Sequence, residues 1–215
     1  MIKSQLFIKK IMLMCVGVFL MTILVTSAHA EDRVVRNHSI TLDDIQEMEI
    51  SNSVGRIDLV QTEVDQIRVV LEIEGKKKGF FRRSVDVEDM DLEIKQRGGT
   101  LFLSFDEKNT NAEWTVEMPS VERTIIQMGV GEIVLDISDT DLDVELGVGD
   151  VNINAQEQRV GRINLNVGVG DARIRGGEVL DSESAFISKS IRAQGSGDKD
   201  LEVDLGVGDV SIRLN

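Results

Sequence analysis

Four acidic residues in the second half of the chain each close the same short pattern, in which two glycines flank one valine. They are Glu132, Asp150, Asp171 and Asp209. Stacked copies of one structural unit would place these carboxylates about 5 Å apart, where like charges repel. Ca²⁺ takes carboxylate oxygens as ligands and could relieve the repulsion, which makes these residues calcium candidates. One carboxylate per unit is few for a calcium cage, and solvent with Arg173 and Arg213 could balance the charge instead, so we expect no metal site.

Residues 31–215 contain no set of side chains for nucleophilic catalysis, since they include no cysteine, no tyrosine and a single histidine, His38. A Ser-His-Asp system needs a rigidly held base. His38 lies near an end that is expected to fray, so we interpret it as a solvated surface residue. We therefore expect no catalytic and no cofactor-binding residues.

Two acidic runs, at 86–91 and 139–143, leave one enzymatic alternative open. Glycoside hydrolysis uses a pair of carboxyl groups that converge on one bond in a cleft. Both runs fall on outward positions of predicted strands or in loops, where solvation is a sufficient explanation for them. A carbohydrate-active enzyme is kept as the alternative to a protein without catalytic activity.

One segment departs from the acidic composition of the chain. It combines five cationic side chains with two phenylalanines: Lys76, Lys77, Lys78, Phe80, Phe81, Arg82 and Arg83. Such a segment could bind anionic lipid headgroups or an acidic partner. Alternatively, it is a solvated hairpin tip whose phenylalanines pack back onto the core. We treat it as the candidate partner-binding site, and as the basis of a third possibility, an envelope-stress accessory protein that contacts a membrane partner.

The acidic repeats lie on predicted β-strands that change face at their centre. Between residues 142 and 148 the apolar side chains stand at even positions, whereas Val151 and Ile153 stand at odd positions. Because alternate residues of a strand face opposite sides, this shift requires a bend or bulge at Gly149 and Asp150. Each copy is therefore predicted to form a strand, a corner and a second strand. The glycines permit the corner, the valine between them is expected to point inward, and the acidic residue is expected to face water.

Copies of this unit recur at a nearly constant spacing. Their central valines are Val130, Val148, Val169 and Val207. The successive separations are 18, 21 and 38 residues, the last being twice 19, so a weakened unit is expected midway, near Ser188. A related pattern surrounds Val54, which lies four times 19 residues before Val130. Units of this kind cannot bury their apolar face alone and must stack on one another. We predict an all-β fold, a parallel β-helix or β-solenoid with Gly-Val-Gly-Asp corners at intervals of roughly 20 residues.

Residues 1–30 have the features of a secretory signal peptide. Three lysines precede an apolar run at 11–25, and Ala28 and Ala30 provide the small residues that a signal peptidase requires. The apolar run of about 15 residues is shorter than the roughly 20 needed to cross a bilayer. An uncleaved N-terminal anchor is the alternative interpretation.

Cleavage after residue 30 would leave residues 31–215 as one β domain, less regular at 31–118 and with a regular repeat array at 119–215. Its formal charge would be −17, because three of the 24 cationic residues lie in the signal segment and all 38 acidic ones lie after it. So acidic a surface argues against nucleic acid and anionic membranes as partners. We expect an exported protein of the periplasm or cell surface, with no integral membrane span in the mature chain.

The pattern Val116-Glu117-Met118-Pro119, followed by Gln127-Met128-Gly129-Val130-Gly131-Glu132-Ile133 and then by repeated Gly-Val-Gly-Asp, resembles the bacterial putative-adhesin family of exported β-strand-repeat domains. The resemblance covers about residues 35–215 and is strongest from Pro119 onward. It implies a single-domain parallel β-helix or related β-solenoid in an envelope protein whose molecular function is unassigned.

Together these features predict a non-enzymatic, exported β-solenoid that acts as a binding or scaffolding module of the cell envelope. Its expected partner is an envelope protein or a glycan, and we expect it to need no cofactor. The contact surface would be one flat face of the solenoid, an open end of the stack, or the segment from Lys76 to Arg83.

Overall fold

The computed structural model describes residues 32–215 except for residues 43, 79–82 and 186–187. Residues 31–215 form one compact unit, and all regular structure in its described part is β-strand, which confirms the all-β prediction. The signal-peptide prediction concerns residues outside the described ones. Within the described residues, no helix is long and apolar enough to cross a membrane.

The strands are β1 (Arg33–Thr41), β2 (Glu47–Gln61), β3 (Gln66–Gly75), β4 (Lys77–Lys78), β5 (Arg83–Ser84), β6 (Glu93–Arg97), β7 (Thr100–Phe105), β8 (Thr110–Met118), β9 (Arg123–Ile137), β10 (Asp141–Ala155), β11 (Val160–Arg175), β12 (Glu178–Ala185), β13 (Ser188–Gln194) and β14 (Lys199–Leu214).

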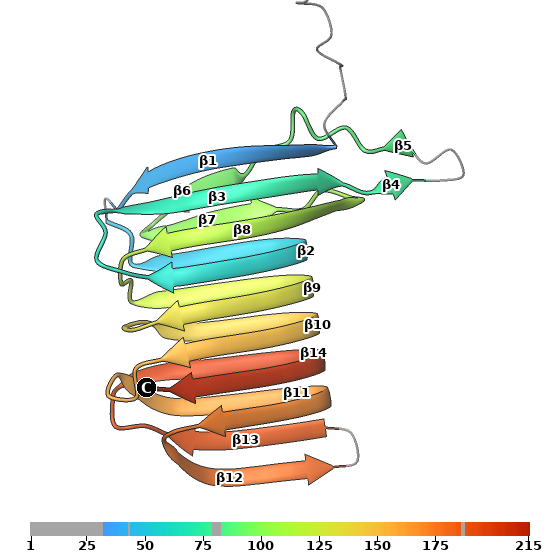
Figure 1. Ribbon diagram of the computed structural model, residues 1–215. Coiled ribbons are helices and arrows are strands. Elements are labelled where there is room, and N and C mark those ends of the chain that lie inside the picture. The colour runs from blue at the N-terminus through green and yellow to red at the C-terminus, as the bar shows by residue number, and fades with distance from the viewer. Residues whose placement is uncertain (1–31, 43, 79–82, 186–187) are drawn as a thin grey trace, which may run out of the picture. The chain divides into compact units, whose positions relative to one another are not determined.

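Five long strands, β2, β9, β10, β14 and β11, lie side by side in this order, and each is parallel to its neighbours. Figure 1 shows each of them curving round on itself, so that its two halves lie one behind the other. The curve falls at the same glycine of every strand, and register aligns these glycines as direct partners: Gly55, Gly131, Gly149, Gly208 and Gly170. The sequence copies therefore occupy equivalent corners, as their spacing predicts.

Only glycine fits the second glycine position of each corner. Gly149 has a φ of 141°, and a Cβ atom built on it would lie 1.7 Å from the carbonyl oxygen of Gly131 on the adjacent strand. An L-residue would be strained in this conformation and would also collide with the neighbouring backbone. The tight corner therefore requires a residue without a side chain at this position.

The predicted inward valine is wrong. Val148 is 46% exposed, whereas Leu146 and Val151, on either side of the corner, are 3% and 0% exposed. The corner is narrow, and the four residues between Leu146 and Val151 pass around its outer side. The extra residue that shifts the apolar positions from even to odd therefore lies on the solvent side of the corner. Asp150, the acidic residue of this corner, is exposed as well.

The order of strands departs from the order of the sequence at the C-terminal end. β14 lies between β10 and β11, so the last copy is inserted between the second and the third. The unit predicted near Ser188 does form a strand, β13, but it pairs antiparallel with β11 and with β12. β13 lacks the two glycines of a corner, so it cannot follow the curved path of the long strands, whereas residues 199–214 carry the full pattern.

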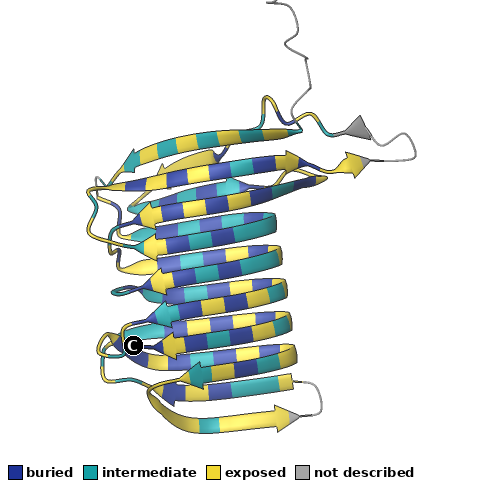
Figure 2. Cartoon of the chain, in the orientation of Figure 1, coloured by how far each residue is buried: buried dark blue, intermediate teal, exposed yellow. Residues whose placement is uncertain are grey.

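The apolar core lies between the two halves of the curved strands. Buried residues alternate with more exposed ones along the five long strands, as Figure 2 shows. The first half of β2 is extended by β7 and then β6, and its second half by β8, which is parallel to it. β3 and β1 follow β8, and each is antiparallel to the strand before it. β3 and β8 bury every second residue toward this core: Ile67, Val69, Leu71, Ile73, Ala112, Trp114, Val116 and Met118.

Candidate binding groove

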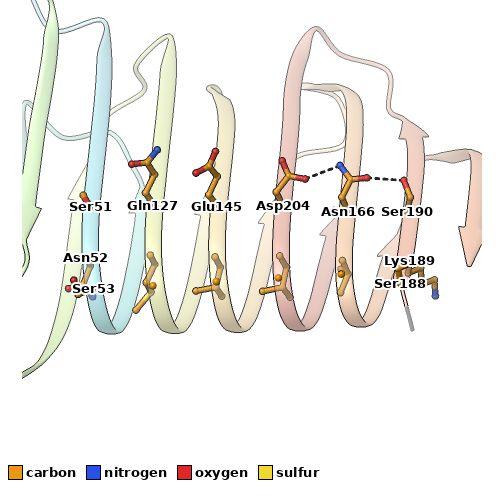
Figure 3. A pocket seen from close by; sticks show the side chains of 18 of the residues that line it. Ser51, Asn52, Ser53, Gln127, Glu145, Asn166, Ser188, Lys189, Ser190 and Asp204 are labelled. Atoms are coloured by element: carbon orange, nitrogen blue, oxygen red, sulfur yellow. Dashed lines mark hydrogen bonds between the residues drawn. The ribbon is translucent and has the colours of Figure 1, made fainter. Parts of the chain in front are cut away.

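A groove of about 980 Å³ crosses the outer face of the first strand halves, beside the corners. It extends over seven neighbouring strands, β2, β9, β10, β14, β11, β13 and β12. Figure 3 shows polar side chains of its wall in one row, one from each of the first six strands. They are Ser51, Gln127, Glu145, Asp204, Asn166 and Ser190.

The wall is held in place by strand register and by hydrogen bonds between its members. Each of the six residues is the direct partner of the next one along the row. The Asn166 side-chain amide donates to Asp204 Oδ1 at 2.9 Å, and the Ser190 hydroxyl donates to Asn166 Oδ1 at 2.9 Å. The side chains are thus spaced by the distance between neighbouring strands, about 4.8 Å.

The floor of the groove is bare backbone. It is formed by the first glycine of each corner: Gly129, Gly147, Gly206 and Gly168. A Cβ atom on Gly147 would lie 2.6 Å from the Gly129 carbonyl oxygen, so a side chain has no room there without displacing the neighbouring strand. The glycine pattern therefore shapes a flat strip that a ligand can approach closely.

The groove is acidic. Among the described residues, four carboxylates line it: Asp106, Glu145, Glu183 and Asp204. Lys189 is the one cationic residue among these described lining residues, and its Nζ lies 2.8 Å from Asp171 Oδ1. A ligand with cationic or hydrogen-bond-donating groups therefore suits the groove better than an anionic one.

An exposed row of valines follows the corners beside the glycine strip. We call it the valine ridge; register aligns its members in the order Val54, Val130, Val148, Val207 and Val169. The last four are 40–47% exposed. A continuous row of exposed apolar side chains is a feature of interaction surfaces, unlike single exposed residues.

The four calcium candidates lie in one column on the other side of the ridge. Register places Arg56, Glu132, Asp150, Asp209 and Asp171 on consecutive strands. Asp150 Oδ1 accepts a hydrogen bond from the Asp209 backbone amide at 3.2 Å, and Asp209 Oδ1 accepts one from the Asp171 amide at 2.9 Å. These carboxylates therefore satisfy backbone donors at the corners of the next strand, which explains the acidic residue of the pattern without a metal ion.

Cations stand at both ends of this column. The Arg56 guanidinium bonds to Asp58 and Glu132, which raise its pKa above the ordinary value. At the other end, hydrogen bonds from Lys189 and Arg173 lower the pKa of Asp171 to about 2. In the part of the chain that the structure describes, no three His, Cys, Asp or Glu side chains are grouped to hold a metal ion. The expectation that the calcium candidates Glu132, Asp150, Asp171 and Asp209 form no metal site stays a prediction.

The predicted basic binding segment is described only in part. Lys76 and Lys77 are exposed, and β4 pairs antiparallel with β5, through Lys78 and Arg83. Phe80, Phe81 and Arg82 lie outside the described residues. Partner binding by this segment therefore stays a prediction.

His38 is not the solvated residue that its position near the end of the chain predicts. It lies within β1, its side chain is 20% exposed, and its Nε2 is 2.8 Å from Asp91 Oδ1. The same strand is tied to this loop through Arg36, whose Nε donates to the Met90 carbonyl at 2.9 Å. His38 thus helps to attach β1 to the loop before β6.

Sequence reasoning missed both the groove and the valine ridge. The outward positions of the copies, among them Gln127, Glu145, Asp204 and Asn166, carry amide and carboxylate groups, and this was a signal in the sequence. The signal is weak, because polar side chains at outward positions of a strand are equally typical of a solvated face. The order of the row also depends on the insertion of β14, which no local pattern reveals.

Comparisons with known proteins find one family and several solved structures that are similar to this chain. The family described as the N-terminal domain of toast_rack, DUF2154, matches residues 29–175. The crystal structure of a putative cell adhesion protein from Clostridium sporogenes covers 85% of this chain and 100% of its own, with a TM-score of 0.54 and 12% identity. A putative adhesin from Parabacteroides merdae covers 83% of this chain and 80% of its own, with a TM-score of 0.34 and 11% identity. Comparison with curated proteins finds no match.

Proposed function

This chain belongs to the family of toast_rack N-terminal domains, and from that premise we propose that it is a non-enzymatic binding module of the cell envelope, built as a β-solenoid. In this proposal residues 1–30 direct export, and residues 31–215 bind an extended partner along the groove. This proposal rests on one observation: the polar row, the bare glycine floor and the valine ridge form a continuous strip.

The geometry of the strip suits an extended polymer. Six strands each supply one polar side chain at intervals of about 4.8 Å, so a chain lying across the strands meets a regular series of acceptors. The carboxylates Glu145 and Asp204 occupy the centre of that series. We therefore propose a basic, extended segment of an envelope protein as the partner, with apolar side chains that contact the ridge.

The experiment is a pull-down from envelope extract with residues 31–215 as bait. A groove variant, Glu145→Gln with Asp204→Asn, removes two negative charges from the strip. A control variant, Glu113→Gln with Asp136→Asn, removes two charges from exposed positions outside the groove. We expect the groove variant to retain at least tenfold less partner, with no loss in the control variant. Equal retention by all three baits would contradict the proposal.

A second bait set tests the basic segment separately. Changing Lys76, Lys77, Lys78, Arg82 and Arg83 to Ser removes its cations and leaves the groove unchanged. A partner lost only from this variant would support the alternative of an accessory protein that contacts a membrane partner.

One observation favours a carbohydrate-active enzyme as the second candidate. Glu145 and Asp204 are direct partners on neighbouring strands of one groove, and retaining glycosidases use two carboxyl groups about 5–5.5 Å apart. Incubation with envelope glycans decides between the two functions. Turnover that is abolished by Glu145→Gln alone would establish the enzyme and contradict the binding module.

A further inference from the structure

The C-terminal strand occupies a central place in the sheet. β14 pairs with β10 from Leu201 to Leu214 and with β11 from Lys199 to Arg213, in parallel on both sides. Residues 156–159 join β10 directly to β11, so the two neighbours of β14 are consecutive strands of the chain. Before β14 is in place, these two strands border a space one strand wide, with unpaired backbone groups on both edges.

This space accepts a particular kind of strand. Its inner side takes six buried side chains: Leu201, Val203, Leu205, Val210, Ile212 and Leu214. At the corner, a Cβ atom on Gly208 would lie 1.7 Å from the Gly149 carbonyl oxygen, so the occupant must carry glycine at that position. β13, which contains no glycine, cannot replace β14 there.

The chain offers several strands of this kind, and two are almost the same. Residues 142–153 of β10 and 201–212 of β14 both follow Leu-X-Val-X-Leu-Gly-Val-Gly-Asp-Val-X-Ile. Recognition of the occupant rests on this pattern and on backbone pairing, both of which are identical in every copy of the chain. The space therefore does not distinguish its own β14 from that of another molecule.

The connection that brings β14 to the space is short and tightly held. Residues 195–198 link β13 to β14, and the Gly195 and Gly197 amides donate to the carbonyls of Gly161 and Val160, each at 2.8 Å. A Cβ atom on Gly197 would lie 2.1 Å from the Arg159 carbonyl group. Short, constrained hinges favour exchange of the element that they connect.

We propose that the space between β10 and β11 is a strand-acceptor site whose second occupant is β14 of another copy of this chain. Reciprocal exchange gives a dimer that keeps every contact of β14 and changes only the path of residues 195–198. Asp204 and Val207 would then come from the partner copy. Each groove and each valine ridge would be built from both chains.

The test uses two single-cysteine chains that are mixed, unfolded and refolded together. Cys15 is replaced by Ser in every chain, and the pair is Asn152→Cys in one chain with Ser211→Cys in the other. These positions are register partners on β10 and β14, so their Cα atoms lie about 4.8 Å apart, within the range for a disulfide. The matched control pairs Asn152→Cys with Val134→Cys on β9, which are also register partners but do not involve β14.

We expect the first mixture to form an interchain disulfide at least tenfold more than the control mixture. Deleting Ser196 and Gly197 should raise the fraction of dimer at least tenfold at equal concentration, measured by light scattering. A single chain carrying both Asn152→Cys and Ser211→Cys should form the internal disulfide, which verifies the place of β14. Equal linking in the two mixtures, no linking in the first, or no disulfide of either kind in the doubly substituted chain would each overturn the proposal.

Discussion

At the scale of single residues, the corners depend on glycines that cannot be replaced. Gly149→Ala would place its Cβ atom against the Gly131 carbonyl oxygen in a left-handed region of backbone conformation. We expect a loss of more than about 3 kcal/mol in the free energy of unfolding, measured with urea. Gly98→Ala is the control, because Gly98 also has positive φ but nothing lies within 4 Å of its added Cβ atom; it should cost about 1–2 kcal/mol. Equal losses would show that the corner is not crowded.

Asn52 is a polar residue in an apolar position. It is 3% exposed, stands in register with the buried Met128, and neither its amide nitrogen nor its oxygen has a hydrogen-bond partner among the described residues. Asn52→Leu should raise the free energy of unfolding by about 1–3 kcal/mol, because two buried polar atoms are removed. Asn52→Asp, measured in the same urea titration, should lower it. Destabilisation by Asn52→Leu would indicate a polar role for this side chain.

Asp171 adds a pH dependence to stability. Its pKa is about 2 in the folded chain, against about 3.9 for an unperturbed Asp. The stabilisation by Lys189 and Arg173 is therefore present above about pH 4 and is lost as pH falls toward 2. Urea midpoints of the parent and of Asp171→Asn should differ at pH 6 and converge at low pH. A difference that does not change with pH would contradict this assignment.

At the scale of the element, the corner determines which side chains support the core. Val148 is 46% exposed, whereas Val151, three residues later, is fully buried. Val148→Thr should change the free energy of unfolding by less than about 0.5 kcal/mol. The same substitution at Val151 should cost about 1–3 kcal/mol, because a hydroxyl group is buried. Thermal unfolding of the two variants compares the two losses directly. A larger loss for Val148→Thr than for Val151→Thr would indicate that Val148 points inward.

At the scale of the whole molecule, excess negative charge opposes folding. The formal net charge is −14, and the corner column and the groove concentrate part of it on neighbouring strands. Raising ionic strength from about 0.01 M to about 0.15 M shortens the Debye length from about 30 Å to about 8 Å. We expect Tm to rise with NaCl over this range. A fall in Tm would show that favourable ion pairs, such as Arg123 with Asp143, outweigh the repulsion.

The order of residues along the chain is sufficient to predict an all-β fold and strands that bend at their glycines. Strand parity and glycine spacing are local properties, so the burial of Leu146 and Val151 and the bend at Gly149 follow from their place in the sequence. The same parity places Gln127, Glu145, Asp204 and Asn166 outward, but it does not show that they form one groove wall.

Only the tertiary structure decided the strand order, the outward valines and the groove. Four nearly equivalent copies can stack in more than one order, because each presents the same backbone edges and the same apolar side chains. Placement of β14 between β10 and β11 depends on contacts between residues far apart in the chain. Val148 faces outward because Leu146 and Val151 are the residues that the narrow corner turns inward, and the order of residues along one strand does not reveal how narrow the corner is.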